Sequence, residues 1–128
     1  MKPKKFKHYS YGSKLGNKLL TRLRLGRTFL NSHGYVIGKV TSPACQCHYN
    51  NETVQHYLLD CFLYTNERQS LFSQVDQLVT NFNTMPKYKK LDMLLFGIPD
   101  NDQYYINKDV AKSVQSFILQ TKRFQIRK

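Results

Sequence analysis

Leucines recur at steps of three and four residues over about residues 15–33, and this period predicts an amphipathic helix. Gly34 follows it, at a position where glycine commonly ends a helix. Residues 35–40 are expected to form a short extended connection. The apolar positions expected on the inner side of the helix are Leu15, Leu19, Leu23, Gly26 and Leu30.

Helical spacing of apolar residues continues in the second half of the chain. It predicts helices over residues 64–79 and 88–96, and a last helix that Asn107 caps. A shorter helix is expected after the turn at residues 50–51, with one of its two asparagines as N-cap and Glu52 in the first turn. Strand signals are scarce, so the predicted fold class is mainly α.

Residues 1–13 lack this periodicity and are predicted to be a basic flexible arm, dotted with aromatic residues. Positive charge extends well beyond that arm. Residues 1–51 contain ten Lys or Arg and no acid, whereas all eight acids lie between Glu52 and Asp109 beside ten further Lys or Arg. The net charge of +12 is therefore concentrated in the first part of the chain.

Concentrated positive charge attracts polyanions. Nucleic acid is the expected partner, because cations that neutralise phosphates release condensed counterions. The alternatives are an anionic membrane and a basic face that only meets water. No apolar run approaches the roughly 18 residues of a membrane span, and no membrane contact is predicted.

Three cysteines and one histidine form the pattern C-x-C-x8-H-x4-C, and they are the strongest chemical signal in the chain. Thiolates and imidazoles are the usual ligands of four-coordinate structural zinc. The ligands predicted for a structural Zn²⁺ are Cys45, Cys47, His56 and Cys61. His48 competes with His56, although chelation directly after Cys47 would crowd the metal. His56 and Cys61 do not share one stripe of a straight helix, so that helix is expected to end between them.

Disulfides are the alternative use of these cysteines. Three is an odd number, so they cannot all pair within the chain, and a bridge between Cys45 and Cys47 would be strained. The basic N-terminus shows no secretory signal, which favours an intracellular protein, nuclear or cytoplasmic, with reduced thiols.

The sequence therefore predicts a single small helical domain over residues 14–128, with about five helices and a zinc knuckle made of a short hairpin and a helix. A structural zinc matters in such a domain because helices with narrow apolar faces bury little surface. The metal can supply about 10 kcal/mol of folding free energy in small modules.

Several segments, in order, resemble one family. Residues 20–31 (LTRLRLGRTFLN), 42–47 (SPACQC), 52–61 (ETVQHYLLDC), 64–68 (YTNER), 94–97 (LLFG) and 120–124 (QTKRF) resemble blocks at the C-terminal end of non-LTR (LINE-type) retrotransposon reverse transcriptases. The likeness covers about residues 14–124. One departure is Arg27, where the family often has His.

This resemblance implies a zinc-knuckle domain that helps grip RNA or DNA beside the polymerase domain of the same element. It implies the same four metal ligands and a basic helix that faces nucleic acid. The nucleic-acid-binding residues expected on that helix are Lys14, Lys18, Arg22, Arg24 and Arg27.

Catalytic motifs are absent from the sequence. There is no Tyr/Phe-x-Asp-Asp motif and no nuclease-like cluster of carboxylates, which two-metal chemistry needs. Asp100 and Asp102 are interpreted as turn residues. The chain is therefore predicted to be noncatalytic. The alternative to nucleic-acid binding is a structural or protein-interaction domain that docks on a polymerase, and a small metal-dependent nuclease is the least favoured reading.

Overall fold

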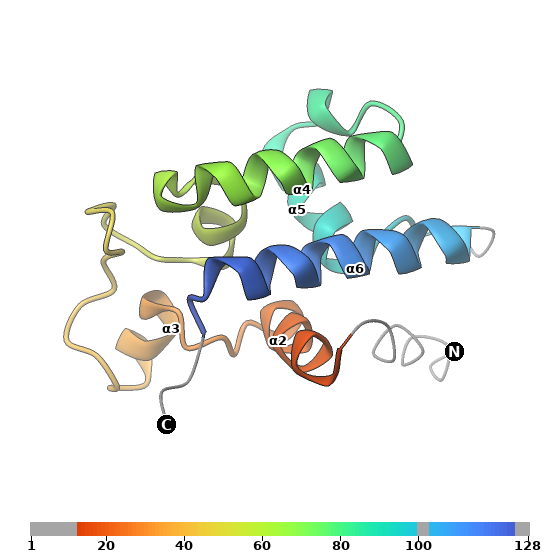
Figure 1. Cartoon of the computed structure of the whole chain (residues 1–128). Helices are drawn as coiled ribbons and strands as arrows, with labels where there is room; N and C mark the ends of the chain where they lie inside the picture. The colour runs from red at the N-terminus through yellow and green to blue at the C-terminus, as the bar shows by residue number, and fades with distance from the viewer. Residues whose placement is uncertain (1–12, 100–102, 125–128) are drawn as a thin grey trace.

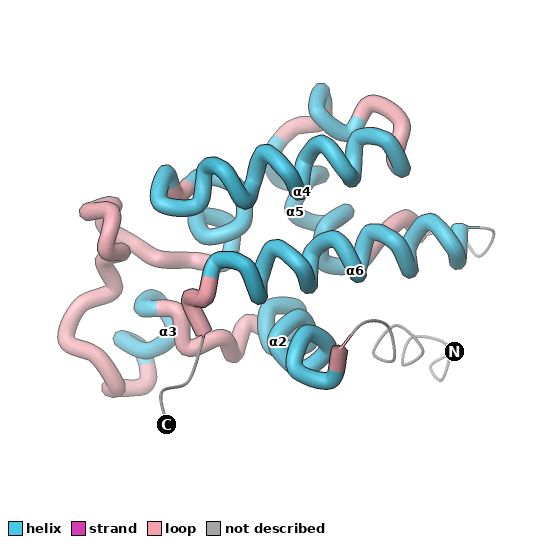
Figure 2. The backbone as a smooth tube through the Cα atoms, viewed as in Figure 1, coloured by secondary structure: helices cyan, strands magenta, loops and turns pink. Residues whose placement is uncertain are grey.

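The computed structural model describes residues 13–99 and 103–124, and this part of the chain is mainly helical with no strand, which confirms the predicted fold class (Figure 2). Its α-helices are α2 (Lys14–Leu25), α3 (Asn31–Val36), α4 (Thr65–Leu78), α5 (Lys87–Phe96) and α6 (Tyr104–Thr121). A π-helical turn, η2 (His56–Asp60), and two 3₁₀ turns, η3 (Phe62–Tyr64) and η4 (Phe82–Thr84), lie between them. The expectations for residues 1–12, for the turn at 100–102 and for the end of the basic tail fall outside the described residues.

Helix α6 forms the centre of the domain and packs against α2, α4 and α5 (Figure 1). Apolar residues line all four helices where they meet, and fully burying each large side chain contributes about 1.5–3 kcal/mol. The buried core includes Leu20, Leu23, Leu71, Val75, Leu94, Val114, Phe117 and Ile118. Helices α4 and α5 match the predicted helices to within about one residue, because their apolar period is clear. Pro86 precedes α5 and Gly97 follows it.

The predicted helix over residues 15–33 is wrong, because the chain breaks after Leu25. Gly26 adopts the left-handed conformation (φ 76°), and the N–H groups of Gly26 and Arg27 turn back to the carbonyls of Leu23 and Arg22. This Schellman-type end satisfies the last carbonyls of α2. A separate helix, α3, begins at Asn31, so the leucine spacing continues across the break between two helices.

Four other local expectations are corrected. Gly34 does not end a helix but lies buried inside α3, where Val40 packs against it, and α3 occupies the start of the expected extended connection. Thr53, rather than Asn50 or Asn51, caps the knuckle helix, since its hydroxyl accepts the N–H of His56 at 3.1 Å. Glu52 therefore precedes that helix.

Asn107 does not cap the last helix either, because α6 begins at Tyr104. The Asn107 amide instead accepts the N–H of Ile98 at 2.7 Å and donates to its carbonyl at 2.9 Å. Gly97 (φ 77°) has no room for a Cβ, which would lie 2.5 Å from the Asn107 side chain. The exit of α5 is thus fastened to the first turns of α6.

Arg68 of α4 closes the C-terminal end of the knuckle helix. Its buried guanidinium donates to the carbonyls of Tyr57 (2.9 Å), Leu58 (2.9 Å) and Cys61 (2.7 Å). These carbonyls lie at the end of a helix, where intrahelical donors run out. One side chain therefore satisfies several buried acceptors and joins α4 to the knuckle.

We expect Arg68→Met to lower the free energy of unfolding by about 3 kcal/mol, because buried carbonyls lose a charged donor. Gln69→Met is the matched control, since Gln69 is the exposed neighbour on the same helix and should change stability by less than about 0.5 kcal/mol. Urea unfolding followed by circular dichroism measures both. Equal midpoints for the two variants would contradict this role for Arg68.

Candidate metal centre

The first half of the knuckle is a tight loop over residues 43–52. The N–H of Glu52 donates to the Pro43 carbonyl at 2.7 Å, and the N–H of Cys45 donates to the Tyr49 carbonyl at 2.9 Å. His48 takes a left-handed conformation (φ 77°) where the loop reverses. The predicted hairpin is therefore a hydrogen-bonded loop, which forms no strand in the described residues. Its tight turn places the thiols of Cys45 and Cys47 close together.

The second half of the knuckle is a widened helical turn. The N–H of Cys61 reaches the carbonyl of His56, five residues earlier, at 2.8 Å, which is the bond of a π-helix. The helix ends at Asp60, as the sequence predicts, but the π winding is not expected from it. Because a π-helical turn brings residues five positions apart into hydrogen-bonding contact, Cys61 lies next to His56.

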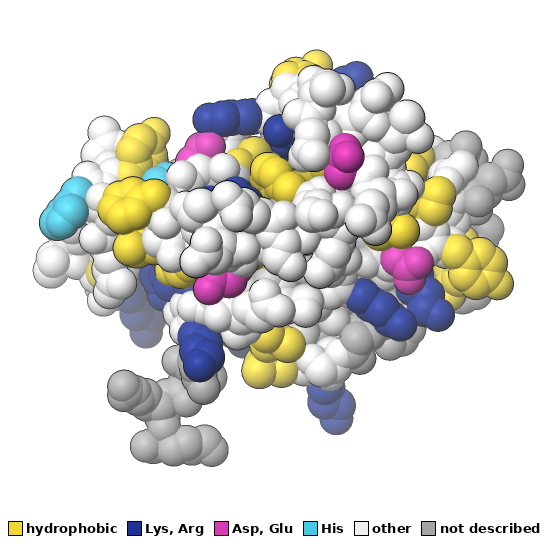
Figure 3. All heavy atoms as spheres, turned by 45° about the horizontal axis from the view of Figure 1, so that its top comes forward, with side chains coloured by type: hydrophobic (Ala, Val, Ile, Leu, Met, Phe, Trp, Pro, Cys, Tyr) yellow, Lys and Arg dark blue, Asp and Glu magenta, His cyan; other side chains and the backbone are white. Residues whose placement is uncertain are grey.

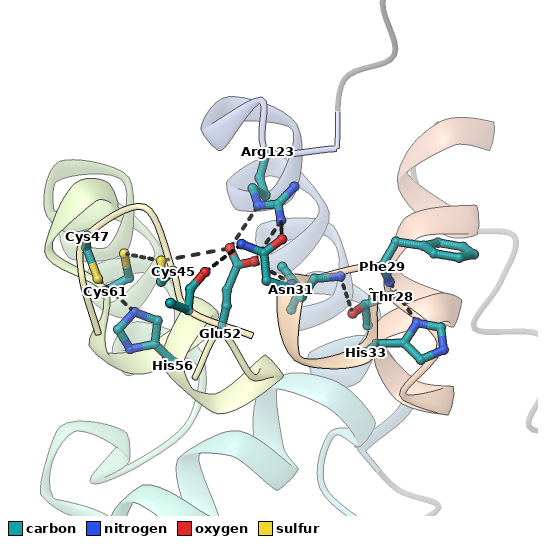
Figure 4. A network of polar contacts seen from close by, with 12 residues as sticks. Thr28, Phe29, Asn31, His33, Cys45, Cys47, Glu52, His56, Cys61 and Arg123 are labelled. Carbon is teal, nitrogen blue, oxygen red and sulfur yellow. Dashed lines mark hydrogen bonds and ion pairs between the residues drawn. The ribbon is translucent and has the colours of Figure 1, made fainter. Parts of the chain in front are cut away.

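These two halves bring the predicted ligands together. The Sγ atoms of Cys45, Cys47 and Cys61 and a ring nitrogen of His56 all lie within 4.8 Å of one another, and all four residues are buried. The Sγ atoms of Cys45 and Cys61 are 3.7 Å apart, and Cys47 Sγ is 3.2 Å from His56 Nε2 (Figure 4). All three cysteines are free.

The spacing fits a metal ion. Zinc–sulfur bonds of about 2.3 Å in a tetrahedral site place two sulfurs about 3.8 Å apart. A disulfide would bring them to about 2.05 Å. The chain thus carries a buried Cys3His cluster that suits a four-coordinate metal.

The competing ligand His48 lies outside this cluster. Its side chain is exposed, and the convergent group contains His56 instead. The ring of Tyr49 stacks on that of His56 with centroids 4.5 Å apart and planes 10° apart. Tyr49 therefore covers the imidazole and fixes its plane, while His48 turns to solvent.

Burial shapes the acid–base behaviour of the ligands. It raises the pKa of the Cys61 thiol to about 12 and also raises that of Cys45. Burial opposes ionisation of Cys47 as well, but backbone N–H groups and the neighbouring thiols outweigh it and lower its pKa. Burial lowers the pKa of His56, so its imidazole stays neutral and able to bind a metal.

Glu52 connects the cluster to the rest of the domain (Figure 4). Its carboxylate is 2% exposed and accepts the N–H of Asn31 at 2.7 Å and two N–H groups of Arg123 at 2.7 and 2.8 Å. One carboxylate oxygen lies 3.9 Å from Cys45 Sγ. Sequence reasoning placed Glu52 only in a helical first turn and gave Arg123 no role. Both residues lie in segments that resemble the reverse-transcriptase family, and this resemblance is the signal that could have pointed to them.

The predicted nucleic-acid-binding residues do not share one environment. Lys14 and Lys18 are exposed and lie opposite the buried face of α2, given about 3.6 residues per turn. Arg22 is half-buried, and Arg27 is exposed just beyond α2. Arg24 donates to the Leu95 carbonyl near the end of α5. The structure thus gives Arg24 a contact inside the domain.

No family model, curated protein or solved structure matches this chain. Within residues 13–99 and 103–124, every helix is too short or too polar to cross a membrane. A functional assignment therefore depends on the cluster, its surroundings and the charge of the chain's own surface.

We expect native mass spectrometry to find one divalent ion per chain. His56→Ala should lose the ion, because it removes one of four convergent ligands. His48→Ala is the matched control and should keep it. Chelation should also unfold the wild-type domain, which loses about 10 kcal/mol of binding free energy. Retention of the ion by His56→Ala and its loss from His48→Ala would reverse the assignment.

Metal affinity should fall as the pH falls. The pKa values of the Cys45 and Cys61 thiols are raised, so both hold protons at neutral pH and must release them on binding. The lowered pKa of His56 means that its imidazole adds no competing proton near neutrality. Release of at least these two protons weakens metal binding by about a hundredfold or more per pH unit on acidification. Competition with a chromophoric chelator at several pH values measures this slope, and a flat profile would contradict it.

Proposed function

We propose that this chain is a noncatalytic structural-zinc module that binds the backbone of RNA or DNA through the outer face of α2. The buried, convergent Cys3His cluster carries the first half of this proposal. Three thiolates and an imidazole favour zinc over the hard cations, which prefer oxygen ligands. A site with four protein ligands leaves no position for a catalytic water, so the metal's role is to hold the fold.

Reduced cysteines also bear on where the module works. All three thiols lie in the cluster and none is bridged. Thiols stay reduced in the nucleus and cytoplasm, where cysteine clusters commonly serve metals. We therefore place the protein inside the cell, in one of these two compartments.

Charge supports the second half of the proposal. Lys14 and Lys18 point away from the core on α2, and no acid occurs in residues 1–51 to offset them. On the face that Figure 3 shows, by contrast, basic and acidic side chains are interspersed. Glu52, the first acid in the chain, is buried against Arg123 and projects no charge to solvent. A polyanion is thus attracted to the α2 side.

The resemblance to LINE-type reverse transcriptases supplies a context for the module. Its family-like blocks contribute Glu52, Arg68 and Arg123, and these residues build the surroundings of the knuckle. We propose that the chain corresponds to the C-terminal knuckle region of such an enzyme, whose polymerase domain is then a partner.

A second candidate is a protein-interaction domain that docks on a polymerase without touching nucleic acid. Exposed apolar side chains at the end of α3 favour it, since Val36 is 79% and Ile37 45% exposed. The two candidates differ in a simple respect. Only the first predicts that removing cations from α2 changes the salt dependence of nucleic-acid binding.

We expect Lys14→Gln combined with Lys18→Gln to weaken binding and to reduce the slope of log K against log salt by about 1.5, because each lost phosphate contact removes about 0.7–0.9. Lys89→Gln with Lys112→Gln is the matched control, since both lysines are exposed on other helices. Fluorescence anisotropy with labelled oligonucleotides across a salt series measures both slopes. A folded wild-type chain that binds no oligonucleotide at low salt would favour the docking domain.

A further inference from the structure

Phe29 has an unusual backbone for an aromatic residue. Its φ is 64°, in the left-handed region that bulky side chains rarely enter, and its side chain is 49% exposed. A strained position persists only where the surroundings enforce it, and such positions cluster at binding sites. Half of a large apolar side chain is thus held in water at a conformational cost.

The neighbours of Phe29 enforce this conformation. Thr28 and Leu30 are 3% and 1% exposed, so the chain is anchored on both sides. The Thr28 hydroxyl accepts the N–H of Leu30 at 2.9 Å. The N–H of Phe29 donates to His33 Nδ1 at 3.1 Å. Both flanking side chains point inward, and Phe29 is left outside.

His33 backs the Phe29 ring from α3. The two ring centroids lie 5.1 Å apart, and the planes are tilted by 53°. Figure 4 shows both rings on the side of α3 away from the cysteines. Because Nδ1 accepts the Phe29 N–H, the ring proton of neutral His33 lies on Nε2. Phe29 therefore offers the apolar face of its own ring, with a hydrogen-bond donor of His33 beside it.

The charge around this pair selects its ligand. Arg27 is exposed two residues before Phe29, and exposed Lys39 follows α3. Helix α2, with Lys14 and Lys18, leads into Phe29 through the turn at Gly26. No acid lies in this part of the chain before Glu52. Exposed aromatic rings among cations that meet phosphates are the signature of single-strand binding.

We propose that Phe29, backed by His33, is a stacking platform for a base of single-stranded nucleic acid. This inference rests on the proposed function and narrows its ligand. An unpaired base presents its face to the ring, while Arg27 contacts a flanking phosphate and the α2 lysines contact phosphates further along the strand. Bases inside a duplex are already stacked, so a duplex uses only the cations. Stacking accepts any base, and the binding is therefore tolerant of sequence.

Phe29→Gly tests the platform, because glycine accepts the left-handed backbone without strain while the ring is lost. The probes are fluorescein-labelled oligouridylate, oligothymidylate of equal length and a blunt duplex. We expect single-strand binding to weaken about tenfold, duplex binding to stay unchanged and the melting temperature not to fall. Phe29→Trp should retain single-strand binding. Phe96→Ala removes another exposed aromatic, 56% exposed on α5, and should change nothing.

The outcomes separate this inference from the proposed function. Equal single-strand affinity for wild type and Phe29→Gly would overturn the platform and leave backbone binding intact. Equal losses on single strands and duplex would also overturn it. A Phe29-dependent attachment to anionic vesicles, with no effect on single strands, would assign the ring to a membrane surface instead. If wild type binds none of the probes, the proposed function and the platform both fail. A comparable loss on oligouridylate and on oligothymidylate, with duplex binding unchanged, supports a platform that accepts any unpaired base.

Discussion

A buried carboxylate determines how the parts of this domain fit together. Removing a charge from water costs several kcal/mol unless partners compensate for it. Glu52 finds these partners in segments that are far apart in sequence: the N–H of Asn31 at the start of α3 and the guanidinium of Arg123 beyond α6. Its own backbone also bonds Pro43 and Ser32. Glu52 therefore joins the knuckle loop, α3 and the chain after α6 through one set of hydrogen bonds.

The same constraint couples the metal cluster to the helical core. Outer partners of a metal ligand fix its orientation and tune its basicity. Glu52 lies beside Cys45, and Arg68 donates to the carbonyl of Cys61. With a divalent ion bound, three thiolates would leave one negative charge on the site, and Glu52 would add a second. The charges of Arg68 and Arg123 would balance these two. Without an ion, burial disfavours the ionised form of these thiols, and this burial raises the pKa values of Cys45 and Cys61.

The sequence correctly predicts those features that depend on residues close together in the chain. The apolar period and the bounding Pro86 and Gly97 located α5, and ligand spacing alone found the Cys3His cluster. The misses have a common cause. Leucine spacing continues across Gly26, so no period marks the break there. Asn107 resembles a cap but bonds Ile98, and Glu52 pairs with an arginine 71 residues away. Tertiary hydrogen bonds of this kind leave no periodic trace, and the π winding that joins His56 to Cys61 leaves none either.

Cations that look alike in the sequence divide into two groups in the fold. The first group serves the interior, since Arg24, Arg68 and Arg123 donate to Leu95, to the knuckle carbonyls and to Glu52. The second group, with Lys14 and Lys18, faces solvent on α2. Net charge alone cannot distinguish them, but the second group lies where a polyanion can reach its cations directly. Arg24 fastens α2 to α5, and the knuckle holds the chain that follows α2 through Asn31. The Cys3His cluster lies in the same knuckle that holds the chain after α2, so the fold of this knuckle helps to orient α2.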